Sequence, residues 1–267
     1  MKKVGLMLLA AVLLLSACGK AVQSPGHEGH QGGASEHAVD DTQAVFQTAD
    51  GVKAKQDTQL NIQINGKDGK PIDQFDLNHE KKMHLIAVSK DLSYFRHLHP
   101  EYKGNGQFTI TTQFPAGGEY RLFADYMPSG KAQTVKSYTL KVQGDVPQAA
   151  VLQPETAWTK TVGGSVVTLS FDHLMAGMDV NLNYMFKDAQ TGSPIKDLQP
   201  YLGAVGHVVI LDEAAEQYLH VHPTDEKSTG PEAVFKTTFP KSGKYKIWGE
   251  FQRGGKVITV PFVVKVP

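Results

Sequence analysis

The feature that most constrains the fold of this chain is a histidine pattern that occurs twice with the same spacing. In each copy a histidine is followed thirteen residues later by a His-x-His-Pro motif. The first triad is His84, His97 and His99, and the second triad is His207, His220 and His222. A Phe-Pro pair follows in both copies, and ten residues beyond its proline comes an acidic residue, Asp125 or Glu250. The repetition predicts two similar folding units in tandem.

Both units have the composition of short β-strands. Runs such as TQLNIQIN, FTITTQF and VITVPFVVKV are rich in β-branched and aromatic residues, and Gly, Pro, Asp and Asn separate them. Turn signals recur roughly every 8 to 12 residues. We therefore expect an all-β chain with two tandem immunoglobulin-like β-sandwich domains, at residues 43–145 and 146–267. A Gly-x-Tyr element in each domain is expected to lock a loop through Tyr120 or Tyr245.

The N-terminal segment has the pattern of an export signal. Two lysines precede an apolar run at residues 4–15 that is short for a bilayer span, and small residues follow. We expect residues 1–17 to be a signal peptide, with a short transmembrane anchor as the alternative. Leu-Ser-Ala-Cys at residues 15–18 resembles the lipobox of bacterial lipoproteins. The resemblance implies that Cys18 carries lipid and anchors an exported protein to the extracytoplasmic side of a membrane.

Residues 18–42 are expected to form a flexible tether after the signal. The segment is rich in Gly, Ser, Gln and His and has almost no large apolar residue. Its histidines, His27, His30 and His37, are weak candidate metal ligands, or simply linker residues. Removal of the signal takes away two lysines and no acid, so the balanced chain becomes net −2. This charge argues against nucleic acid as a partner.

Strand geometry brings each histidine triad together. A hairpin centred between Asp91 and Leu92 places His84 opposite His99, with His97 on the same face. A hairpin centred between Ala214 and Ala215 does the same for the second triad. Directly paired residues have Cβ atoms about 5 Å apart, a distance that a single metal ion bridges through imidazole rings.

Three neutral imidazoles suit a borderline transition metal such as copper or zinc. Asp125 and Glu250 are candidates for a fourth ligand, or for acids that orient a ligand histidine. In the alternative interpretation, the six histidines are hydrogen-bonding members of buried strand pairs. His79 and His173 have no counterpart in the other copy, so we expect them to be ordinary surface or core residues.

The segments MHLIAVSKDLS, HLHP, HVHP and GGEYRLFADY resemble bacterial secreted or lipid-anchored proteins of the YtkA-like family and copper-handling sandwich domains of the CopC-like type. The resemblance covers both repeats and implies exported metal handling. CopC-like sites use a histidine at the mature N-terminus, whereas the lipobox resemblance places Cys18 there. The metal site of that family is therefore not carried over to this chain.

The expected function is that of a lipid-anchored extracytoplasmic protein that binds a transition metal, copper first and zinc next. It would serve metal buffering, delivery or sensing, with a metal-handling envelope protein as partner. One alternative is a non-catalytic envelope interaction or assembly module with structural histidines. Another is a zinc-dependent hydro-lyase or hydrolase, since three histidines resemble an open zinc site. We expect no enzyme, because the chain shows no separate general base or substrate-binding motif.

Overall fold

The computed structural model describes residues 41–48 and 51–267, and at position 220 it describes the backbone alone. Every regular element in these residues is a β-strand, so the predicted all-β class is confirmed. None of the described residues forms a helix that is long and apolar enough to cross a membrane. The predicted signal peptide and nearly all of the tether lie outside the described residues.

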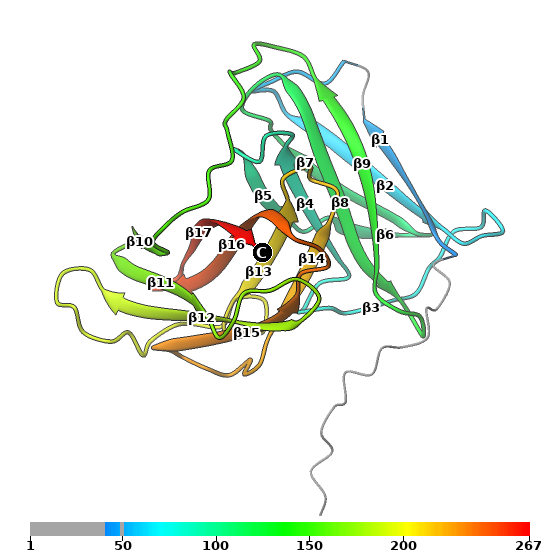
Figure 1. The fold of residues 1–267 in the computed structure, drawn as a ribbon. Coiled ribbons are helices and arrows are strands. Elements are labelled where there is room, and N and C mark those ends of the chain that lie inside the picture. The colour runs from blue at the N-terminus through cyan, green and yellow to red at the C-terminus, as the bar shows by residue number, and fades with distance from the viewer. Residues whose placement is uncertain (1–40, 49–50) are drawn as a thin grey trace, which may run out of the picture. The chain divides into compact units, whose positions relative to one another are not determined.

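The first repeat is a sandwich of two antiparallel sheets. Its strands are β1 (Gln43–Thr48), β2 (Thr58–Asn65), β3 (Phe75–Asp76), β4 (Met83–Ser89), β5 (Phe95–Leu98), β6 (Glu101–Gly104), β7 (Gln107–Thr112), β8 (Gly118–Pro128) and β9 (Thr134–Val142). One sheet has the order β1-β2-β7-β6, and the other has the order β3-β8-β4-β5 with β9 also paired to β8 (Figure 1). This division of the strands is immunoglobulin-like.

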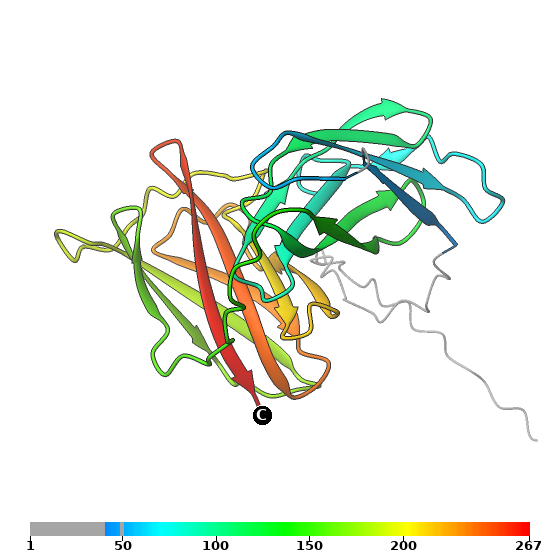
Figure 2. The same ribbon diagram turned by 90° about the horizontal axis from the view of Figure 1, so that it is seen from above.

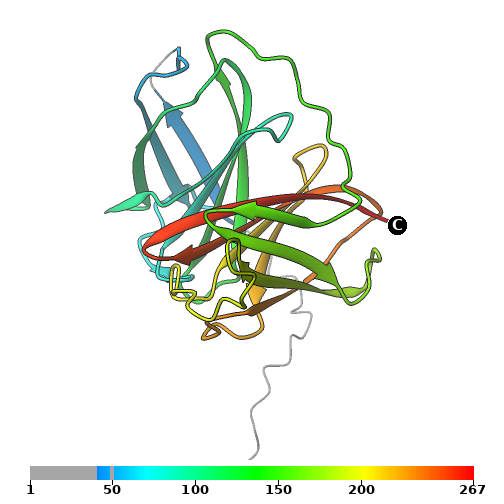
Figure 3. The same ribbon diagram turned by 90° about the vertical axis from the view of Figure 1, so that its left-hand side faces the viewer.

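The second repeat is built from eight antiparallel strands. They are β10 (Thr159–Val162), β11 (Ser165–Phe171), β12 (Asp179–Asp188), β13 (His207–Asp212), β14 (Tyr218–Pro223), β15 (Glu232–Thr238), β16 (Gly243–Arg253) and β17 (Lys256–Val266). Their order is β10-β11-β12-β15-β14-β13-β16-β17, so β14 connects the two layers by pairing with both β13 and β15. Figure 3 shows the long β16 and β17 lying side by side.

The loops at the start of β8 and β16 are held by tyrosines, as predicted. The hydroxyl of Tyr120 donates to the carbonyl of Ala116 at 2.9 Å, and that of Tyr245 donates to the carbonyl of Lys241 at 2.8 Å. Both bonds reach four residues back along the chain, as in the tyrosine corner of immunoglobulin-like domains. The structural role predicted for these tyrosines is confirmed.

β4 and β13 are buried along nearly their whole length, unlike β2, whose burial alternates. One face of each strand points into the core of its own sandwich, where Leu85 and Ile210 lie. The other face packs against the other repeat, and the two repeats belong to one compact unit. Strands that are buried on both faces need apolar residues at successive positions, which explains the uninterrupted runs LIAV and VVIL.

The apolar contact between the repeats joins equivalent positions from each side. Phe95 stacks on Trp248 with ring centroids 4.7 Å apart, and Tyr218 stacks on Phe123 at 5.4 Å. The first repeat contributes Ile86, Val88, Leu92 and Phe123, and their counterparts in the second are Val209, Leu211, Ala215 and Trp248. Figures 1 and 2 show β4 and β5 beside β13 and β14 at this boundary. The repeats therefore meet through matching faces, which are the faces that carry the histidines.

Candidate metal site

Both histidine hairpins have the predicted register. Leu85 pairs with Leu98 across β4 and β5, and Val208 pairs with Val221 across β13 and β14. The tight turns between these strands explain why the spacing of thirteen residues recurs. A register shifted by one residue would move each histidine to the opposite face of its strand.

The first triad forms a compact group. One ligand atom from each of His84, His97 and His99 lies within 4.8 Å of the others. The ring centroids are 5.0 Å apart for His84 and His97, 5.2 Å for His84 and His99, and 4.6 Å for His97 and His99. The side chain of His97 is only 3% exposed, and His84 is buried as well. Three imidazoles thus surround one point away from bulk solvent.

A chain of hydrogen bonds runs through two of these rings. His84 Nε2–H donates to the backbone carbonyl of Asn78 at 2.8 Å, because a carbonyl oxygen only accepts. In the neutral ring Nδ1 then holds a lone pair, and it lies 2.8 Å from His97 Nε2. His97 Nδ1 lies 2.6 Å from Glu250 Oε2. The outer nitrogens of both rings therefore have oxygen partners, and their inner nitrogens point toward each other.

His99 is the exception in this network. Its Nε2 atom is buried and has no hydrogen-bond partner among the described residues. Burial, followed by the proximity of His97, His84 and Lys81, lowers the pKa of His99 to about 3. The ring is therefore neutral at physiological pH, the form in which histidine binds metal ions.

The two acidic candidates have different surroundings. Glu250 is buried and belongs to the second repeat, yet it bonds His97 of the first repeat. Burial raises its pKa to about 7, against weaker opposing effects of the Thr259 hydroxyl and the Arg96 charge. Asp125 accepts hydrogen bonds from the Gln133 amide at 2.7 Å and from the Tyr218 hydroxyl at 3.2 Å, so it too is bonded to the other repeat.

A second group of imidazoles lies beside the first triad. His207 is buried and its Nε2–H donates to the backbone carbonyl of Tyr201 at 3.1 Å. His79 Nε2 lies 2.8 Å from Nδ1 of the exposed His222. The centroid of the His207 ring lies 5.9 Å from that of His84 and 5.8 Å from that of His97. The histidines of both repeats therefore belong to one cluster at the boundary between them.

His79 is half-buried, and its ring packs within this cluster, a place that the sequence did not indicate. The equivalent position in the second repeat is Leu202, so comparison of the two copies carried no signal for it. His173, by contrast, is exposed and lies 3.2 Å from Asp172, as expected of a surface residue. Cys18 and the tether histidines lie outside the described residues, and the side chain of His220 is not described.

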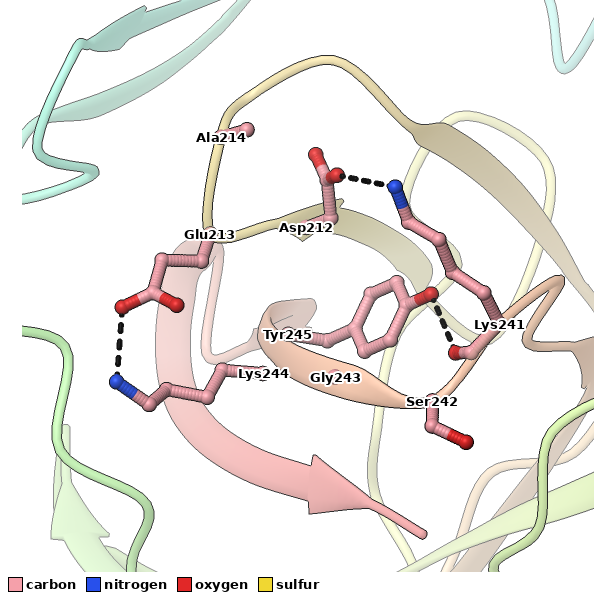
Figure 4. Close-up of a pocket in the computed structure, with 8 residues that line it drawn as sticks. All are labelled: Asp212, Glu213, Ala214, Lys241, Ser242, Gly243, Lys244 and Tyr245. Atoms are coloured by element: carbon pink, nitrogen blue, oxygen red, sulfur yellow. Dashed lines mark hydrogen bonds and ion pairs between the residues drawn. The ribbon is translucent and has the colours of Figure 1, made fainter.

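Two cavities lie at the ends of β13 and β4 that are far from the histidines. One, of about 290 Å³, is lined by residues 212–214 and 241–245. Figure 4 shows its carboxylates paired with lysines, Asp212 with Lys241 at 3.4 Å and Glu213 with Lys244 at 2.8 Å. A larger cavity of about 620 Å³ occupies the matching place around Tyr120 in the first repeat. No histidine lines either cavity, so both are separate from the histidine cluster.

A family model described as Domain of unknown function (DUF8832) matches the chain twice, at residues 37–144 and 160–267. No curated protein matches the chain. Similar solved structures include a two-domain fibronectin type III segment of chicken tenascin, with 13% identity, a TM-score of 0.25, and coverage of 83% of this chain and 98% of that chain. They also include the fibronectin(III)-like modules of CbhA from Clostridium thermocellum, with 11% identity, a TM-score of 0.24, and coverage of 84% and 92%.

Invasin, a bacterial integrin-binding protein, is also similar, with 15% identity, a TM-score of 0.25, and coverage of 84% of this chain and 39% of that chain. At these TM-scores the likenesses carry no argument about function. The resemblance to YtkA-like and CopC-like proteins stays a prediction, since none of these matches bears on it. The histidine cluster has to be interpreted from its own chemistry.

Proposed function

The chain belongs to the family of the Domain of unknown function (DUF8832) and carries two copies of that domain, and from this premise we propose that the two copies together bind transition-metal ions. The ion expected first is copper, and zinc is next. Imidazole nitrogen is a favoured ligand of both metals, whereas calcium and magnesium prefer oxygen.

The observation that carries this proposal is the state of His99. A buried nitrogen without a hydrogen-bond partner costs about 1 to 3 kcal/mol in folding free energy. Here the nitrogen belongs to a neutral ring whose neighbours His84 and His97 offer ligand atoms within 4.8 Å. A metal ion coordinated by Nε2 of this ring, together with His84 and His97, would remove this cost.

The hydrogen bonds that His84 and His97 make on the side away from the other rings also suit metal binding. Histidines that bind a metal through one nitrogen usually donate the other N–H to a carbonyl or carboxylate, which fixes the ring and raises its basicity. His84 has the Asn78 carbonyl for this purpose, and His97 has the Glu250 carboxylate. The inner nitrogens of the two rings are 2.8 Å apart. Two nitrogens on one tetrahedral ion would be about 3.3 Å apart, so binding requires only a small separation of the rings.

Metal binding should release a proton below pH 7. In the metal-free state the hydrogens lie on His84 Nε2, on His97 Nε2 and on the Glu250 carboxyl, which donates to His97 Nδ1. When an ion takes the lone pairs of His84 Nδ1 and His97 Nε2, two hydrogens remain, on His84 Nε2 and His97 Nδ1. Glu250 becomes the carboxylate that accepts the second of these, and one proton leaves. The buried negative charge of Glu250 is then linked to the bound cation by the ring of His97, which lies between them.

The N-terminal pattern supports a place for this activity. If Cys18 is lipidated as the lipobox resemblance implies, the metal site would lie at a membrane on its extracytoplasmic side. There it would buffer metal ions, deliver them to an envelope protein or sense them. His27, His30 and His37 would add weak ligands close to the membrane. We propose no catalytic role, since the Glu250 carboxylate, which contacts the first triad, already bonds His97.

The test is calorimetric titration of the full-length protein in detergent with Zn(II) and Cu(II). His27, His30 and His37 are replaced by alanine in every sample, so that weak binding by the tether does not enter. We expect His99→Ala to remove one tight site, while His173→Ala, a change at an exposed histidine, retains it. Equal stoichiometry and affinity in His99→Ala and the parent would contradict the proposal, as would a parent that binds neither metal tightly.

A second candidate function is a non-catalytic envelope interaction module in which the histidines are structural. The bond between His97 and Glu250 favours it, because this bond already joins the two repeats without a metal ion. That function predicts that His97→Ala lowers stability and that no metal ion changes the stability of the parent. The metal proposal predicts that Zn(II) stabilises the parent more than it stabilises His99→Ala.

A further inference from the structure

Two matching turns approach the histidine cluster, one from each repeat. Residues 78–81 form a turn closed by two backbone hydrogen bonds between Asn78 and Lys81, of 2.8 and 3.1 Å. Residues 201–204 form the same turn between Tyr201 and Ala204, with bonds of 2.8 and 3.3 Å. The first residue of each turn offers its carbonyl to a triad histidine six positions later, His84 or His207. The turns therefore have equivalent roles in the two repeats.

The central residues of the two turns differ. Both turns require positive φ angles, which are 47° and 68° at His79 and Glu80 and 52° and 80° at Leu202 and Gly203. Turns of this type favour Asn and Gly, and histidine is also among the residues enriched at positive φ. The ring of His79 packs against imidazoles of the other repeat.

The two ring contacts of His79 fall within the range of ring separations in the first triad. Its ring centroid lies 4.7 Å from that of His207 and 5.0 Å from that of His222. The first triad has centroid separations of 4.6 to 5.2 Å. His79 Nε2 and His222 Nδ1 are 2.8 Å apart, the same separation as the inner nitrogens of His84 and His97.

The outer nitrogen of His207 is also arranged as in the first triad. His207 Nε2–H donates to the Tyr201 carbonyl, which leaves Nδ1 of the neutral ring with a lone pair. His222 is exposed and His79 half-buried, so this group is closer to solvent than the first triad. The first triad is more deeply buried, with His84 1% exposed.

We propose that His79 is a ligand of a second metal site made from both repeats, together with His207 and His222. The proposal rests on the metal-binding function proposed above and adds to it a ligand from the first repeat. The ion would be a borderline divalent metal such as Zn(II) or Cu(II), since the ligands are imidazole nitrogens. His220 is a further candidate ligand of this site, on the evidence of the sequence repeat alone. An ion held in this way links the turn at residues 78–81 to β13 and β14 of the other repeat.

The test uses the full-length protein in detergent with the three tether histidines replaced by alanine, titrated with Zn(II) alone. The variant is His79→Asn, because asparagine tolerates a positive φ angle and removes the imidazole. Its control is His173→Asn, at an exposed histidine outside the cluster. We expect two tight ions per chain in the parent and in His173→Asn, and one in His79→Asn with the affinity of the remaining site changed less than about twofold.

A further variant, His79→Cys, guards against a loss of binding caused by disturbance of the turn. A thiolate is a good zinc ligand, so this variant should retain two ions. Two ions bound to His79→Asn with unchanged affinities would overturn the second site. One ion in the parent, lost in His99→Ala, would also overturn it while leaving the first site intact. A parent that binds no zinc or copper tightly would instead overturn the proposed function itself.

Discussion

Replacing Glu250 with glutamine should remove a large part of the pH dependence of folding. In the folded protein burial raises the pKa of Glu250 from 4.5 to about 7. The protonated carboxyl donates to His97 Nδ1 across a distance of 2.6 Å, and a glutamine amide N–H would donate to the same atom. The variant therefore resembles the protonated form of the wild type at every pH.

The sign and size of the effect follow from linkage. A carboxyl group whose pKa is raised on folding binds its proton more tightly in the folded state, so its stabilising contribution is complete below pH 4.5 and is lost as the pH rises through about 7. Each pKa unit corresponds to about 1.4 kcal/mol, so the loss above pH 7 is about 3 kcal/mol. Between pH 4.5 and pH 8 the free energy of unfolding of the wild type should therefore fall by about 3 kcal/mol more than that of Glu250→Gln.

The assay is urea unfolding of metal-free protein in EDTA between pH 4.5 and 8.5. Fluorescence of Trp248, which lies at the contact between the repeats, and of Trp158 reports the transition. Glu226→Gln, at an exposed loop glutamate, is the matched control. If the stability profiles of Glu250→Gln and the wild type run parallel over this pH range, Glu250 does not hold a proton in the folded state and the reasoning is refuted.

Three further predictions concern the cluster and the fold. Calorimetry of Zn(II) binding at pH 6 in buffers of different ionisation enthalpy should show release of about one proton from the first site. Glu250→Gln should abolish that release. Release of the same number of protons by the variant and the wild type would contradict the assignment of this proton to Glu250. His99→Ala should change metal-free stability by less than about 1 kcal/mol, because removal of the unpartnered Nε2 offsets the lost packing of the ring. His97→Ala should cost about 2 to 3 kcal/mol, because it removes the partner of Glu250 Oε2 and leaves only the Thr259 hydroxyl, among the described residues, bonded to that carboxyl group. Similar losses in the two variants, measured by urea unfolding, would argue against this network. Tyr245→Phe should cost about 1 kcal/mol through loss of its hydrogen bond to Lys241, and an unchanged urea midpoint would show that this bond does not contribute.

The strand hairpins that carry the histidines were predictable because their information is local. Alternation along a strand and the length of the turn determine which residues face each other, so His84 and His97 could be placed on one face from their spacing. The loop-locking role of Tyr120 was predictable for a similar reason, since its bond reaches only four residues back. Duplication strengthened both predictions by presenting each pattern twice.

The partners of the acidic residues were not predictable in this way. Asp125 and Glu250 lie beside His84 and His207 in the paired strands, which made each of them a candidate for its own repeat. In the folded protein Glu250 instead bonds His97 of the other repeat. No repeating pattern along the sequence indicates such a contact, because the contact depends on how two complete sandwiches pack.

By itself the sequence determined the β-strands, the duplication and the register that gathers each triad, since all of these follow from side-chain alternation and turn length. Only the tertiary structure decided that the two histidine faces meet, that Glu250 bonds His97, and that His79 enters the cluster from the opposite repeat. The physical reason is that apolar residues such as Ile86 and Val209 share a face with the histidines. Burying these apolar side chains against each other brings the imidazoles of both repeats out of water together.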